Sequence, residues 1–129
     1  MAVTHSNAAL SAATDAVTAL IGASGKLKYR LSGTIGAPGT VVATLSLSAT
    51  AFGAAVNGVA TANAITSDTN ATGNASPVAT ASLETSGGTL VIHCAVAASA
   101  SDINMANGLV VAAGDTVSCS SLTYKAINA

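Results

Sequence analysis

Lys26-Leu27-Lys28-Tyr29-Arg30-Leu31, at residues 26–31, is the stretch that decides the fold class. Apolar and basic residues alternate in it without a fault, as in a β-strand whose two faces meet different surroundings. We therefore expect the apolar set to face a core and the basic set to face outward. Further strands are predicted at residues 41–47, 58–65, 77–83, 89–97 and 116–127.

Local signals refine this pattern of strands. The glycine pair at residues 87–88 predicts a hairpin turn before the strongest strand, residues 89–97. In the last strand the inward set changes phase near residues 120–121, which predicts a β-bulge. Residues 66–76 contain no large apolar side chain, so we expect an exposed loop there.

Residues 6–21 form the one predicted helix. Ser6 or Asn7 can cap its start, and Gly22 follows its end, where a left-handed residue commonly sits. The helical spacing of apolar residues predicts one buried face. That face consists of Leu10, Ala13, Val17 and Leu20.

These elements predict a mainly β fold, a small antiparallel β-sandwich or jelly-roll-like domain with one N-terminal α-helix. We expect residues 1–25 to form an N-terminal helical arm and residues 26–129 the β domain. An alanine-rich helix of this length is marginal alone and needs a surface. The sequence leaves open whether its own sheet or a neighbouring subunit provides it.

The amino-acid composition indicates a chain that associates with other subunits. Only 7% of the residues are charged, against about 25% in ordinary soluble domains. Leu, Ile, Val and Phe supply 29 of the 129 residues, so much of the 50% hydrophobic content is alanine and the predicted core is weak. The mean hydropathy of +0.61 argues against disorder.

Charge and hydropathy also restrict the partners and the location. The net charge of -1 and the pI near 6.0 give no reason to expect binding to nucleic acid or to an anionic membrane. The sequence has no apolar run of the length that a membrane span requires, and no secretory signal, so we expect synthesis in the cytoplasm.

Two sets of side chains are candidates for an interface. The basic stripe of Lys26, Lys28 and Arg30 is interpreted either as a solvated face or as a group that docks on an acidic patch of a neighbouring subunit. The second set is the apolar helix face, represented by Leu10, Val17 and Leu20.

Cys94 and Cys119 stand apart in the sequence, so zinc or thioredoxin-like chemistry is not indicated. They are predicted to be buried thiols, with a disulfide between strands or between subunits as the alternative. His5 has no acid near it in sequence with which to form a catalytic pair. His93 is next to Cys94 in a predicted strand, and neighbouring side chains in a strand point to opposite faces, so these two form no dyad. We therefore expect no catalytic residues, no metal site and no cofactor.

Several segments resemble a group of small proteins encoded among the virion genes of tailed bacteriophages. The resemblance is carried by residues 3–6 and 12–17, 51–55 and 58–62, and 101–104 and 113–118, and it spans most of the chain. It implies a virion component made in the host bacterial cytoplasm. The assignment it favours is a capsid decoration or cement protein, because such proteins are of this size, rich in β-structure and often trimeric.

The function expected on these grounds is structural. The partners would be the phage major capsid protein or other virion subunits, and the chain would form a homo-oligomer, with a trimer favoured. The alternative is a head-fibre or tail-associated module that binds a host receptor or glycan. Aromatic residues make up only 2% of the chain, which disfavours the glycan binder. An enzyme is the weakest of the three hypotheses.

Overall fold

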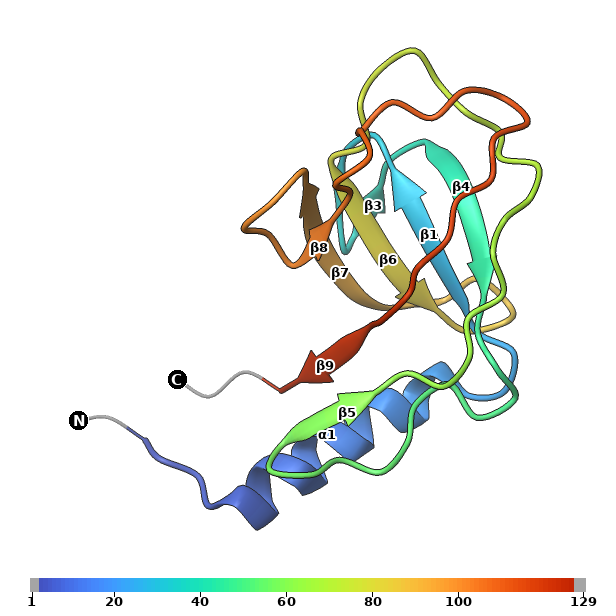
Figure 1. The fold of residues 1–129 in the computed structure, drawn as a ribbon. Coiled ribbons are helices and arrows are strands. Elements are labelled where there is room, and N and C mark those ends of the chain that lie inside the picture. Colours follow the sequence, from blue (N-terminus) through green and yellow to red (C-terminus); the bar gives the residue numbers. More distant parts are fainter. Residues whose placement is uncertain (1–2, 127–129) are drawn as a thin grey trace.

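The computed structural model describes residues 3–126 and is mainly β with one N-terminal helix, as expected (Figure 1). The helix is α1 (Asn7–Ile21). The strands are β1 (Lys26–Arg30), β2 (Gly33–Thr34), β3 (Ala37–Pro38), β4 (Val41–Ser46), β5 (Val59–Thr61), β6 (Thr80–Glu84), β7 (Leu90–Ala97), β8 (Ile103–Asn104) and β9 (Thr123–Lys125).

Five strands form a curled sheet in the order β4-β1-β6-β7-β8. Neighbouring strands are antiparallel except β7 and β8, which run parallel. Two short pairs, β2–β3 and β5–β9, lie outside this sheet. The expectation of antiparallel pairing throughout is therefore wrong at β8.

A sandwich or jelly roll is not confirmed, because the layer over the sheet is mostly irregular chain. In Figure 1 the chain after β5 runs as a loop along the β4 side of the sheet, and the chain after β8 crosses in front of the sheet as a loop. They contribute buried side chains to the same core as the strands. Their sequences are rich in small residues and do not alternate apolar and polar residues over the length that a strand of a second sheet would need. These buried residues are Ala71, Val78, Val111, Val117 and Leu122.

The core is organised around one face of β1. Leu27 lies opposite Leu45 of β4 on one side and Leu83 of β6 on the other, so three leucines stand in one row. In the next row Tyr29 lies between two alanines, Ala43 and Ala81, whose small side chains leave room for its ring. All are buried, which confirms the inward set predicted at residues 27 and 29.

Most predicted strands occur, although several are shorter than expected. The turn at residues 87–88 is confirmed, and Gly88 adopts a φ of 93°, which favours glycine. The strand predicted at residues 116–127 is wrong in extent, since only an isolated bridge at Val117 and β9 are present. The burial of Val117, Leu122 and Ala126 shows the predicted change of phase, but the β-bulge expected near residues 120–121 is wrong, because residues 118–122 belong to no strand. Residue 127 lies outside the described residues.

Residues 66–76 form the predicted loop and are mostly exposed, but part of this loop is fixed against the rest of the chain. Ala71 is buried, and its N–H donates to the carbonyl of Asp115. The N–H of Gly73 donates to the carbonyl of Val42 in β4. Because alanine and glycine allow close backbone approach, this segment lies against the sheet despite its lack of large apolar residues.

Helix α1 begins and ends as predicted. The Ser6 hydroxyl accepts a hydrogen bond from the N–H of Ala9 at 3.1 Å, and Gly22 ends the helix with a φ of 70°. Its buried face is different from the predicted one, however. Leu20 is 65% exposed. The residues buried on the helix are Leu10, Thr14, Thr18 and Ile21.

Hydrogen bonds to the backbone explain why threonines lie on the buried face. The Thr14 hydroxyl donates to the carbonyl of Gly58 at 2.6 Å and accepts from the N–H of Ala126 at 3.0 Å. The Ser11 hydroxyl accepts from the N–H of Gly58, and the Asp15 carboxylate accepts from the N–H of Ala55. The helix is therefore held on β5 and β9 of its own chain by polar contacts.

Thr14→Val keeps the shape of the side chain but removes both hydrogen bonds. We expect a loss of about 1–3 kcal/mol in unfolding free energy, because the Gly58 carbonyl and the Ala126 N–H would stay buried without a partner. Urea denaturation measures this loss. Thr69→Val, at an exposed threonine, is the matched control and should change the unfolding free energy little. Equal stability of the two variants would contradict the role given to Thr14.

Candidate functional site

The basic stripe is part of an ion network within the chain. Glu84 of β6 accepts a hydrogen bond from Arg30 Nη2 at 2.6 Å, and Lys28 Nζ lies 3.1 Å from its other carboxylate oxygen. Lys26 Nζ donates to the hydroxyl of Ser46. Arg30 is only 6% exposed, so the expectation of an outward-facing stripe is wrong for it.

Glu84 is fully buried and is held by several donors. The Ser82 hydroxyl donates to the same oxygen that Arg30 contacts, and Arg30 Nε in turn donates to Ser82. Arg30 Nη1 completes the arrangement by donating to the carbonyl of Gly39. Burial alone would raise the pKa of the Glu84 carboxyl, but the hydrogen bonds from Arg30, Ser82 and Lys28 outweigh it and lower the pKa.

Sequence reasoning missed Glu84 because the partner of a strand residue is set by pairing between strands. The register places Lys26 opposite Glu84 and Lys28 opposite Ser82. The predicted strand at residues 77–83 ended one residue too early. The available signal was that Glu84 is the only glutamate of the chain and directly follows that strand.

The helix residues proposed for an interface have three different environments. Leu10 is buried within the chain, and Val17 is half-buried. Leu20 is exposed, as are Ile35 at the turn between β2 and β3 and Val56 before β5. Leu20 therefore remains accessible to a partner, whereas Leu10 does not.

The two cysteines are free, half-buried thiols. Burial raises the pKa of the Cys94 thiol to about 11, with the Asp102 carboxylate adding to the rise. Burial also raises the pKa of Cys119, whose thiol donates to the carbonyl of Ser121 at 3.3 Å. The predicted disulfide alternative is absent between these two cysteines, and both thiols are half-buried where full burial was predicted.

His93, Cys94 and Asp102 all line one groove beside β7. Cys94 and His93 are adjacent in β7, so their side chains lie on opposite faces of the sheet. The carboxylate of Asp102 accepts from the N–H of Ala95, and the amide oxygen of Asn104 accepts from Ser101, so both stabilise the backbone. Residues 3–126 contain no group of three or more His, Cys, Asp or Glu placed to hold a metal ion.

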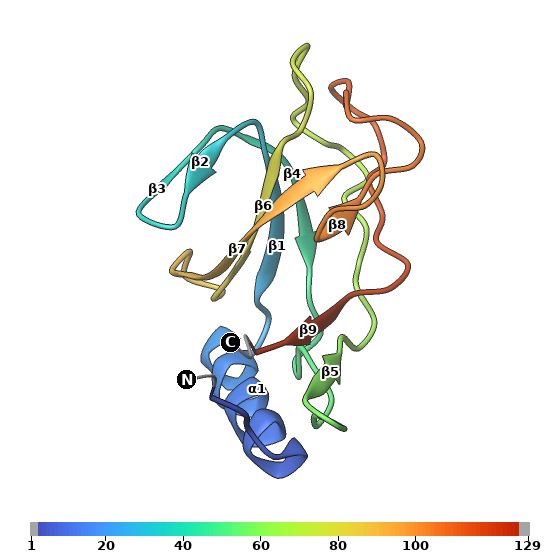
Figure 2. The same ribbon diagram turned by 90° about the vertical axis from the view of Figure 1, so that its left-hand side faces the viewer.

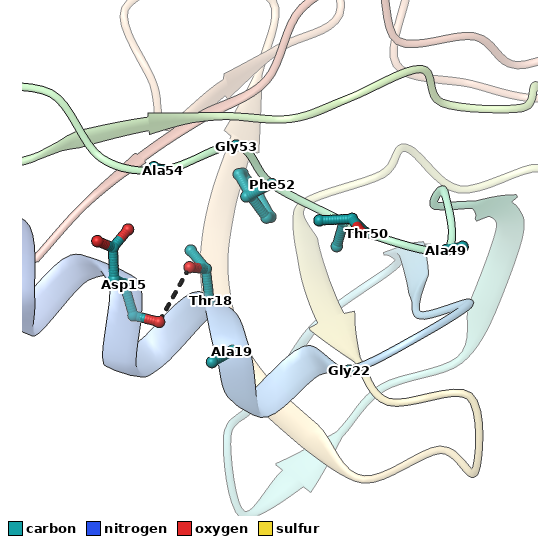
Figure 3. Close-up of a pocket in the computed structure, with 10 residues that line it drawn as sticks. Asp15, Thr18, Ala19, Gly22, Ala49, Thr50, Phe52, Gly53 and Ala54 are labelled. Atoms are coloured by element: carbon teal, nitrogen blue, oxygen red, sulfur yellow. Dashed lines mark hydrogen bonds between the residues drawn. The ribbon is translucent and has the colours of Figure 1, made fainter.

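Two hollows are relevant to binding. The first, of about 310 Å³, lies between α1 and residues 49–54. Figure 3 shows Asp15, Thr18 and Phe52 beside it. The Asp15 carboxylate there already accepts from the N–H of Ala55, and most other lining residues are small, so the hollow offers little specific chemistry. The second is a groove of about 590 Å³ along β7, bounded by α1, β8 and β9.

Comparison of the chain with protein-family models, curated proteins and solved structures finds no match. Within the described residues, the one helix is too short to cross a lipid bilayer.

Glu84→Gln should reduce the unfolding free energy at neutral pH by about 3–5 kcal/mol, because it leaves Arg30 buried without its counter-ion. The carboxylate in the native protein stabilises the fold fully above the unfolded pKa of about 4.3, and this contribution is lost as the pH falls through the lowered native pKa. Urea denaturation between neutral and acidic pH measures both effects.

The wild type should therefore lose more stability on acidification than Glu84→Gln. Asp115→Asn, at an exposed carboxyl, is the matched control and should behave like the wild type. A Glu84→Gln protein as stable as the wild type at neutral pH would contradict the importance of the network.

Both thiols should react slowly with a disulfide-exchange reagent in the native protein, since only the thiolate is nucleophilic. With its raised pKa, Cys94 should be ionised in only about one molecule in a thousand at about pH 8. Denaturant should release two fast-reacting thiols per chain. Mass spectrometry without reductant that finds Cys94 and Cys119 bridged would contradict this expectation.

Proposed function

We propose that this chain is a structural, non-enzymatic subunit of a tailed-phage virion. Its role would be that of a capsid decoration or cement protein, which binds the assembled head shell and stabilises it through contacts with the major capsid protein. The observation that carries this proposal is a surface that combines very little free charge with exposed large apolar side chains.

The ion network accounts for much of the low surface charge. The chain has four basic and five acidic residues. Arg30 and Glu84 are buried, and Lys28, whose side chain is 25% exposed, pairs with Glu84. A protein that stays separate from its neighbours usually relies on interspersed surface charges. Of the nine charged residues, two are buried and a third is paired with one of them, which leaves six to separate the surface from other subunits and favours permanent contact.

Exposed apolar side chains support the same role. Leu20 is 65% exposed and Val56 is 70% exposed, and their elements, α1 and the segment before β5, are joined by hydrogen bonds. Large aliphatic residues in this position give a partner apolar surface to cover. The resemblance to small phage virion proteins adds independent support.

Quantitative mass spectrometry of purified virions tests the proposal. Hundreds of copies per particle would support a shell protein, since decoration requires many sites on the head. A handful of copies would instead support the head-fibre or tail-associated module, and absence from virions would refute both structural assignments.

Sedimentation with expanded heads that lack the protein gives a second test. The purified chain should bind these heads, and the bound heads should resist heat or chelator better than bare ones. Failure to sediment with the heads would contradict the decoration role even if the chain occurs in virions.

A further inference from the structure

The main sheet ends at β4 on one side, whereas on the other side the short β8 covers only part of β7. The edge of β4 is covered by its own chain: Ser46 and Thr66 exchange backbone hydrogen bonds, and the N–H of Thr44 donates to the Asp68 carboxylate. The edge of β7 pairs with β8 only at Val96 and Ala97. Within the described residues, the rest of that edge has no partner strand.

The direction of the amide groups identifies the open position. The N–H of Val96 donates inward to Ala79, next to β6, whereas the N–H of Ala95 points outward to the Asp102 carboxylate. Alternation along a strand therefore directs the N–H of His93 outward as well. The Asp102 carboxylate accepts the outward N–H of Ala95, whereas His93 lies in the part of the β7 edge that has no partner strand.

This open edge forms one wall of the groove of about 590 Å³. Its lining is mainly apolar and includes Val91 and Ile92 of β7, Ile35 from the β2–β3 turn and Val17 of α1. Ile35 is itself exposed. His93 also lines the groove, and its Nε2 atom is buried without a hydrogen-bond partner among the described residues. An extended chain beside β7 would meet both backbone donors and apolar side chains.

Charge at the two ends of the groove favours a second copy of this chain as the occupant. Asp102 lies at the Ala95 end. Lys125 is the last residue of β9 and lines the same groove. In Figure 2 the end of β9 lies next to α1, away from β8, which follows Asp102 and pairs with the end of β7. An antiparallel copy related by a two-fold axis reverses these ends. Lys125 of each copy would then meet Asp102 of the other.

We propose that the uncovered edge of β7 pairs with the same edge of a second copy of this chain, in antiparallel orientation. The pairing extends the sheet across the interface and covers Val91 and Ile35. It makes the chain a two-fold dimer, in place of the trimer that the resemblance to phage proteins implies. The pairing does not depend on capsid attachment, so a chain that dimerises but fails to bind heads would refute only the proposed function.

Sedimentation equilibrium at micromolar to millimolar concentrations tests this pairing. The wild type should show a monomer–dimer equilibrium. His93→Pro removes the outward N–H and leaves the hydrogen bonds to β6 intact. One interface hydrogen bond is lost from each copy, so the dissociation constant of the dimer should rise about tenfold or more. Val91→Lys places a charge in the apolar groove and should have the same effect.

Two further variants make the result specific. Val110→Lys, at an exposed valine outside the groove, is the matched control and should dimerise like the wild type. Lys125→Glu should weaken the dimer, and Lys125→Glu combined with Asp102→Lys should restore part of the affinity. Circular dichroism verifies that each variant is folded. A monomeric or trimeric wild type, or folded Val91→Lys that dimerises normally, would overturn the pairing.

Discussion

The scarcity of large side chains is the constraint on which the rest of this structure depends. The bulky residues are concentrated where they are most effective, in the row of Leu27, Leu45 and Leu83 across three adjacent strands. On the opposite face of the same strands, the buried carboxylate of Glu84 joins β1 to β6 through Arg30 and Lys28. The β1–β6 pair is therefore stabilised from both faces, by apolar packing on one and by ions on the other.

The remaining elements are attached to this pair largely by hydrogen bonds. Thr14 connects α1 to Gly58 and Ala126, and Asp68 connects the irregular layer to β4. Short polar side chains can make such contacts in many arrangements, which explains why irregular chain replaces the second sheet of a sandwich. The same use of polar groups inside the protein leaves few charges outside, and this is the physical link between the fold and the proposed role in a multi-subunit particle.

The sequence was informative wherever the signal was local. Alternation predicted β1 and β7, Ser6 and Gly22 marked the helix ends, and the glycine pair marked the turn before β7. It was uninformative wherever the answer depended on which strands become neighbours. The counter-ion of Arg30, the burial of Thr14 and the open edge of β7 are all consequences of tertiary pairing. The helix face was predicted wrongly for the same reason, since apolar spacing cannot reveal a helix held by threonine hydroxyls.

The molecule consists of a most stable part, β1 and β6, and parts attached to it, and native-state hydrogen exchange by NMR tests that division most directly. The amides of β1 and β6, including Leu27 and Leu83, should exchange only through global unfolding. The amides of Ala55, Gly58 and Ala126, which bond to helix side chains, should exchange through a smaller opening of lower free energy. Equal protection of both sets, or faster exchange in β1 and β6, would contradict the account.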